Sequence, residues 1–163
     1  MLKPRIQLAF ITSLALAGCT DDGTSSSFGD SLVDPQLPPR GSTDLPQWIA
    51  AGHYQSWRCE AAPHAGRAPS PHGTSRICNN DALQASSAGG LLAVGAASVK
   101  EIFDGNGIAA YAVSRKLTAG DGGDHWYWFE GSAGHASANG QGLGGCVGCH
   151  QRAARDFTFT VVP

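Results

Sequence analysis

Apolar and polar residues alternate with a period of two along much of the second half of the chain. Successive side chains of a β-strand point to opposite faces of a sheet, so this alternation predicts strands. The predicted strands are Ala97–Phe103, Ile108–Leu117, His125–Glu130 and Phe157–Val162. Turn-forming residues follow the first two strands, at Asp104–Gly107 and Asp121–Asp124. The pattern therefore predicts an antiparallel sheet.

The predicted strands differ in whether one face or both faces must be buried. In His125–Glu130 the tyrosine and the phenylalanine face one way and the two tryptophans face the other. Both faces of this strand must therefore be covered. In Phe157–Val162 the division into an apolar and a polar face is cleaner, which predicts a strand buried on one side.

Two short helices are predicted before the strands. Asp44 is placed to cap a helix over Pro46–Ala51, with Trp48 and Ile49 on its buried side and Gly52 at its end. A second helix is predicted over 81–88. Together these elements predict an α+β domain, a mainly antiparallel β-sheet with short flanking helices.

Residues 1–18 have the layout of a bacterial lipoprotein signal. Two basic residues precede an apolar run, Ile6–Leu16, that is too short to span a bilayer permanently. Leu16-Ala17-Gly18-Cys19 resembles the lipobox, in which cleavage before the cysteine leaves that residue to carry lipid. The alternative is an ordinary cleaved signal with a chance cysteine. We expect lipidation of Cys19, anchoring to a membrane and exposure to the periplasm; Thr20 favours the outer membrane.

Residues 19–44 are rich in Ser, Gly, Asp and Pro and predict a flexible tether, which leaves 45–163 as one folded domain. Of 11 Lys and Arg, two leave with the signal, so nine remain against 13 Asp and Glu, a formal charge of −4. This balance lacks the basic footprint of a nucleic-acid-binding protein. The oxidising compartment favours disulfides or covalent haem over reduced thiols.

Cys146-Val147-Gly148-Cys149-His150 has the spacing of c-type haem attachment. In this motif two thiols bond to the haem vinyl groups and the following imidazole binds the iron. The alternatives are a redox-active cysteine pair and half of a structural zinc site. We expect one haem c per chain, held by Cys146 and Cys149, with His150 as its axial ligand.

The remaining axial position of that iron decides its chemistry. Met1 is the only methionine and leaves with the signal, which excludes a His/Met cytochrome. An open position is expected, and a second histidine is the alternative. The histidines of the mature chain outside the motif are His53, His64, His72, His125 and His135.

Cys59 and Cys78 lie in a Pro-rich region together with His64 and His72. In an oxidising compartment we expect the two cysteines to form a disulfide, which closes a loop of about 20 residues and contributes roughly 3 kcal/mol. Two unpaired thiols or a Cys/His metal site are the alternatives.

Three further stretches lie in a recognisable order: Gly95–Glu101, the aromatic strand His125–Phe129 and, after the haem motif, Asp156–Thr160. This arrangement, over residues 45–163, resembles the cytochrome P-460 family and the related beta-type cytochromes c-prime. The resemblance implies a mainly antiparallel β fold, often dimeric, with a five-coordinate haem.

Enzymatic members of that family oxidise hydroxylamine, bind nitric oxide and link a lysine covalently to the haem. The matching residue is Lys100, and the alternative is a solvated strand lysine. We therefore expect binding or oxidation of a small nitrogen compound, with electrons leaving to a partner cytochrome. Glu130 and Asp124 flank the aromatic strand without a fixed direction, so the pattern assigns no proton acceptor.

Because the sequence assigns no proton acceptor, two other interpretations stay open. One is a non-catalytic cytochrome that binds nitric oxide or transfers electrons. The other is a disulfide-linked surface lipoprotein without haem.

Overall fold

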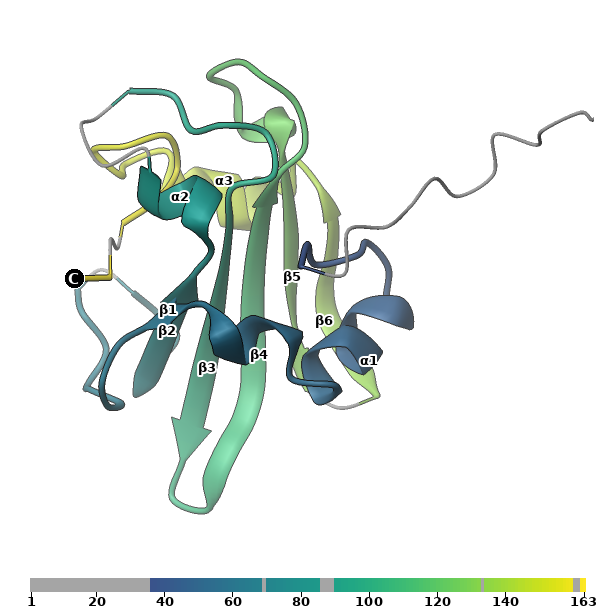
Figure 1. Cartoon of the computed structure of the whole chain (residues 1–163), viewed down its shortest axis with the longest axis vertical. Helices are drawn as coiled ribbons and strands as arrows, with labels where there is room; N and C mark the ends of the chain where they lie inside the picture. Colours follow the sequence, from purple (N-terminus) through teal and green to yellow (C-terminus); the bar gives the residue numbers. More distant parts are fainter. Residues whose placement is uncertain (1–35, 69, 86–89, 133, 160–161) are drawn as a thin grey trace, which may run out of the picture. The chain divides into compact units, whose positions relative to one another are not determined.

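A six-stranded antiparallel sheet organises the domain, and its strands are neighbours in chain order (Figure 1). The computed structural model describes residues 36–68, 70–85, 90–132, 134–159 and 162–163. The strands are β1 (Arg58–Cys59), β2 (Ser75–Asn79), β3 (Ala97–Asp104), β4 (Gly107–Lys116), β5 (Trp126–Ser132) and β6 (His135–Gln141). The helices are α1 (Asp44–Ala50), α2 (Asp81–Ala85) and α3 (Gly144–His150), with short 3₁₀ turns η1 (His53–Ser56) and η2 (Gly123–His125). The α+β class and the antiparallel sheet are as predicted.

Strands β3, β4 and β5 match three of the predicted strands within two residues at each end. A tight turn joins β3 to β4, and residues 117–125, which include η2, join β4 to β5, so both pairs are local in sequence. Figure 1 shows α2 and α3 near one end of these strands and the β3–β4 turn at the other.

Helix α1 covers one face of the sheet. Its Leu45, Trp48 and Ile49 are buried in a cluster with residues of β2 to β5, which include Val99 and Phe129. Thr43 occupies the N-cap without a side-chain hydrogen bond, so the predicted capping role of Asp44 is wrong. Asp44 lies instead in the first turn, where its carboxylate complements the helix dipole.

Helix α3 and the segment around α2 cover the opposite face. Trp126 and Trp128 of β5 are buried there in a cluster that also contains Leu83 and Leu92, and side chains of α3 pack against it. The tyrosine and phenylalanine of β5 belong to the other cluster, under α1. The prediction that both faces of this strand are covered is confirmed.

The predicted C-terminal strand is wrong. No strand forms over the described residues 157–159, and residues 160–161 lie outside the described part. Asp156 has a φ of 32° and Phe157 a φ of 61°, in the left-handed region that a strand excludes. The amide of Thr158 donates to the carbonyl of Arg155 at 2.6 Å, so the chain makes a turn where the alternation suggested extension.

Three strands were not predicted. Strand β6 forms within the glycine-rich stretch before the Cys-x-x-Cys-His motif. Strands β1 and β2 lie in the Cys- and Pro-rich region, where Cys59 pairs with Cys78 in the sheet. The same two residues form a disulfide with a Cα–Cα distance of 4.0 Å.

The predicted signal at 1–18, Cys19 and most of the predicted tether lie outside the described residues, as do the last three residues of the predicted second helix. In the part that the structure describes, no helix has the length and apolarity needed to cross a membrane.

Candidate functional site

Helix α3 carries all three residues of the Cys-x-x-Cys-His motif. Residues three and four apart share a face of an α-helix, so Cys146, Cys149 and His150 lie close together on one side. Each of them is half-buried, and both cysteines are free thiols. Burial raises the pKa of Cys146, with smaller contributions from Glu130 and Cys149, so its thiol is protonated at neutral pH.

His150 is fixed at its Nδ1 atom. This nitrogen lies 2.7 Å from the carbonyl oxygen of Phe157. A carbonyl only accepts, so Nδ1 carries the proton and Nε2 keeps its lone pair for a metal ion. The rings of Trp128 and Phe159 flank the imidazole, with centroids at 4.5 and 5.3 Å. Burial lowers the pKa of His150 and the charge of Lys100 adds to this effect, which favours the neutral, ligating form.

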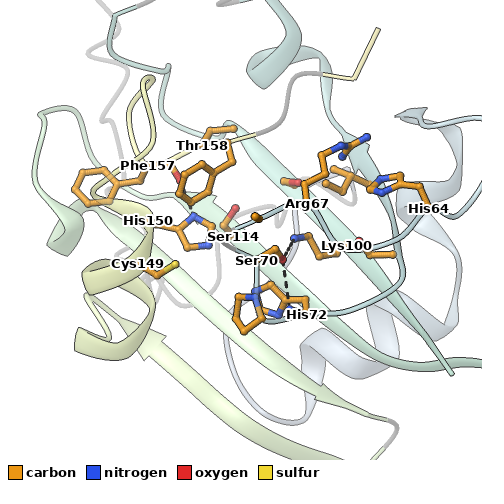
Figure 2. A pocket seen from close by; sticks show the side chains of 16 residues that line it. His64, Arg67, Ser70, His72, Lys100, Ser114, Cys149, His150, Phe157 and Thr158 are labelled. Carbon is orange, nitrogen blue, oxygen red and sulfur yellow. Dashed lines mark hydrogen bonds between the residues drawn. The ribbon is translucent and has the colours of Figure 1, made fainter.

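A pocket opens beside this helix face. It lies between α3, the strands β3 and β4, and the segment 64–75. A second hollow shares residues from each of these walls with the first, so the two are continuous. Figure 2 shows His150 and Lys100 extending into the same space from different walls, with Cys149 beside His150.

The register of the sheet explains the floor of this pocket. Residues paired across strands point to the same face, and one such row runs from Lys100 through Ala112 to Glu130. The next row runs from Ser98 through Ser114 to Trp128. Small side chains at the centre of both rows leave room, and larger functional groups stand at the edges.

Lys100 points into the pocket, on the strand face that it shares with Ser98. Its Nζ lies 3.4 Å from the hydroxyl of Ser70, and it has no ion pair within 4.0 Å among the described residues. Burial lowers the pKa of Lys100, and the charge of Arg67 adds to this effect. A lysine in this setting has an increased neutral, nucleophilic fraction.

His72 and Glu130 complete the wall opposite α3. Nδ1 of His72 lies 3.3 Å from a carboxylate oxygen of Glu130, and their side chains are 15% and 41% exposed. Burial, followed by the charges of Lys100 and His150, lowers the pKa of His72 from 6.5 to about 4. These effects outweigh the carboxylate, and the imidazole is therefore neutral at pH 7.

Sequence reasoning named both residues without placing them. The direction of Glu130 was readable, because it stands two positions after Trp128 and so shares its face. The location of His72 was not, since it lies on a long loop without a periodic pattern.

A buried carboxylate holds the loop that carries His72 in position. Glu60 accepts from Arg67 at 2.6 Å and from the backbone amide of Ile77 at 2.8 Å, and it lies 2.9 Å from Nε2 of His64. Burial alone would raise the pKa of Glu60, but these hydrogen bonds lower it. The neighbouring Cys59–Cys78 disulfide fixes the two ends of the loop, so these thiols are not metal ligands here.

The other candidate histidines have different surroundings. His64 lines the pocket but is engaged with Glu60. His53 stacks on Trp48, on the face covered by α1. Nδ1 of His125 lies 2.8 Å from the hydroxyl of Thr118, and His135 is exposed at the start of β6.

The residues present fit a covalently attached haem. Cys149 lines both hollows and Cys146 lines one, so each thiol faces the space that a macrocycle would fill. Nε2 of His150 is not hydrogen-bonded to any described residue. The buried indole N–H of Trp128, which also lines the pocket, has no hydrogen-bond partner among the described residues. A bound group in the pocket would be able to supply an acceptor for this donor.

No group of three or more His, Cys, Asp or Glu side chains in the described ranges is arranged to hold a metal ion. Comparisons with protein-family models, with curated proteins and with solved structures found no match for this chain.

The depressed pKa of His72 makes the stability of the fold dependent on pH. Between pH 6.5 and 4 the unfolded chain binds a proton at this residue and the folded chain does not. Acidification from pH 6.5 to pH 4 therefore lowers the free energy of unfolding by up to about 3 kcal/mol. Urea unfolding at pH 7 and pH 4 measures the loss.

His72→Gln is expected to lose less stability than the wild type over the same pH interval. His135→Gln is the matched control, because this exposed histidine should leave the pH dependence unchanged. Equal acid sensitivity in the wild type and His72→Gln would contradict the assignment.

Proposed function

We propose that this protein is an exported mono-haem c-type cytochrome of the P-460 type, whose five-coordinate haem binds or oxidises small nitrogen compounds such as hydroxylamine or nitric oxide. The observation that carries the proposal is one pocket lined by His150, Cys149 and Lys100, residues from two separate parts of the chain. The Cys-x-x-Cys-His motif would attach the haem. Lys100 matches the lysine that the enzymatic members of the family link to their haem.

Three residues of α3 would hold the cofactor. Cys146 and Cys149 form the thioether bonds, and Nε2 of His150 binds the iron while Nδ1 donates to Phe157. When bound, the haem supplies an open coordination position and accepts electrons that then leave to a partner cytochrome. The rings of Trp128 and Phe159 pack beside His150 on this side of the pocket.

The rest of the pocket supports a role beyond simple electron transfer. Oxidation of hydroxylamine to nitric oxide releases three protons and three electrons, so it requires a proton acceptor. Glu130 lines the pocket as a partly exposed carboxylate, whereas the lowered pKa of His72 beside it makes that imidazole a weaker base. Glu130 is therefore the candidate for the acceptor that sequence reasoning lacked, and it favours the catalytic alternative over a purely nitric-oxide-binding or electron-transfer protein.

Lys100 is the candidate for a covalent bond to the haem. Its ammonium has no carboxylate partner among the described residues, and burial increases its neutral fraction. The lipobox at Cys19 supports anchoring in the bacterial cell envelope with the domain facing the periplasm, the outer membrane being favoured. Pairing with a second copy belongs to the same proposal, through the family resemblance.

The test is the optical spectrum and intact mass of the full chain, expressed in the periplasm with haem-attachment machinery. We expect a red protein whose mass includes one haem. A strongly red-shifted main band, with loss of hydrogens confined to a Lys100–haem peptide, supports the cross-link. Lys100→Arg is the control, which should keep the haem but show an ordinary spectrum.

A colourless chain without added mass would refute the proposal. An ordinary spectrum in the wild type, unchanged in Lys100→Arg, would leave a c-type cytochrome and contradict the cross-link.

A further inference from the structure

A fully buried ion pair lies next to the segment that orients His150. Nζ of Lys116 and a carboxylate oxygen of Asp156 are 2.6 Å apart, and both side chains are 0% exposed. Lys116 ends β4, whereas Asp156 follows α3 by six residues. The pair therefore joins the sheet to the chain segment immediately after the haem motif.

Asp156 is held by more than the lysine. The oxygen that binds Lys116 also accepts from the backbone amide of Leu92 at 2.7 Å, and the other oxygen lies 3.4 Å from Nε1 of Trp126. Three donors from separate parts of the chain thus converge on one carboxylate. Such convergence fixes the position of this residue against rotation in every direction.

The turn anchored in this way is strained. Asp156 and Phe157 both have positive φ, a strained conformation for a bulky residue such as Phe157. It persists only where the surroundings enforce it. The ring of Phe157 packs against the buried cluster that contains Trp126 and lies beside Gly123, where a Cβ atom would lie 3.1 Å from the ring. Ring and carboxylate together hold the turn.

The strained turn determines where the carbonyl of Phe157 lies relative to His150. The left-handed turn brings the carbonyl of Phe157 back towards α3, where it accepts from Nδ1 of His150 at 2.7 Å. An extended strand at this point, as the alternation predicted, would alternate its carbonyls sideways along the strand and would not turn back to the helix. The hydrogen bond at His150 therefore depends on the turn, and the turn depends on Asp156.

We propose that Asp156, fixed by Lys116, is a positioning residue that sets the hydrogen bond between His150 and the carbonyl of Phe157, and through it the orientation and basicity of His150 as an iron ligand. This inference rests on the proposed function, since it gives His150 the role of ligand. An outer hydrogen bond to the distant nitrogen of a ligating histidine selects its tautomer and strengthens its bond to the metal.

The experiment compares Asp156→Gly with the wild-type full chain. Glycine accepts positive φ but removes all three side-chain hydrogen bonds, so the turn is free to reorient. In the haem-bearing ferrous protein we expect a lower iron–histidine stretching frequency by resonance Raman spectroscopy. In chain produced without haem, ¹⁵N spectra of the histidines should show His150 shifting from the Nδ1–H towards the Nε2–H tautomer, by up to about ten-fold.

A matched control separates positioning from general destabilisation. Glu101 is also a buried, ion-paired carboxylate, but it binds Arg76 and Tyr54 on the sheet face covered by α1. Glu101→Gln should lower stability and leave the signature of His150 unchanged. Should Asp156→Gly fail to fold, Asp156→Asn replaces it, with a smaller shift in the same direction.

An unchanged His150 signature in a folded Asp156 variant would overturn the proposal, as would an equal change in Glu101→Gln. Absence of haem from the wild type contradicts the proposed function instead, and the tautomer measurement still tests the role of Asp156.

Discussion

In the Lys100→Arg background, replacing both Cys146 and Cys149 with alanine is expected to abolish covalent attachment of haem. Thioether bonds survive denaturation, whereas the bond between iron and Nε2 of His150 does not. The Lys100→Arg chain should therefore stain for haem on a denaturing gel, and the triple variant should not. Intact mass gives the same answer, because only the chain that keeps both cysteines carries the mass of one haem.

Matched single substitutions distinguish the roles of the three residues of α3. Cys146→Ala or Cys149→Ala leaves one thioether, so the haem should stay attached with one vinyl group unmodified. His150→Ala should keep both thioethers but change the spectrum, since it removes the axial ligand and not the covalent link.

The same cysteine substitutions with Lys100 present test the proposed link at this lysine. Haem that remains attached in Cys146→Ala/Cys149→Ala, and is lost when Lys100→Arg is added, would support a link at Lys100. Haem that remains attached in the triple variant would contradict the assignment of the thioethers. A link at Lys100 would also explain why Lys100 extends into the same pocket as His150.

The sequence predicted the centre of the sheet because the information there is local. Strands β3 to β5 alternate clearly and are joined by turns rich in Gly and Asp, so pairing and register follow from short-range pattern. The three candidate haem-binding residues on α3 could be named for a similar reason, since covalent haem attachment would impose a fixed spacing that is visible in any context.

The edges of the sheet could not be predicted in the same way. Strand β6 is built mainly from Gly, Ala, Ser and Asn, which carry almost no apolar alternation, and its pairing with β5 supplies the order. Strand β1 is two residues long and is defined by its partner β2. In both cases a neighbouring strand, and not the local pattern, decides the conformation.

In the C-terminal segment, by contrast, a strand was predicted that the structure does not form. Alternation of Phe157, Thr158 and Phe159 is what a strand would show, yet the backbone turns at Asp156. Contacts with residues 30 to 64 positions away hold that turn, and none of them is visible in the local pattern. The same limit applied to the pocket, because the direction of Glu130 could be read but the location of α3 above it could not.

The buried ion pair is expected to give the largest change in stability from a single substitution. Lys116→Met keeps the length of the side chain but removes the ammonium group, which leaves the carboxylate of Asp156 buried without a counter-charge. Loss of one partner of a buried pair costs about 3–5 kcal/mol, a large fraction of the free energy of unfolding of a typical domain. Urea denaturation at pH 7 measures this change directly.

The double variant Lys116→Met/Asp156→Asn tests the cause of that loss. Neutralising both partners removes the uncompensated charge, while asparagine still accepts from the amide of Leu92, so the double variant should recover much of the lost stability. A double variant no more stable than Lys116→Met would show that packing of the lysine, which also lies 5.3 Å over the ring of Trp126, matters more than its charge. A loss below about 1 kcal/mol in Lys116→Met would contradict a buried pair altogether, because only pairs in contact with water are worth so little.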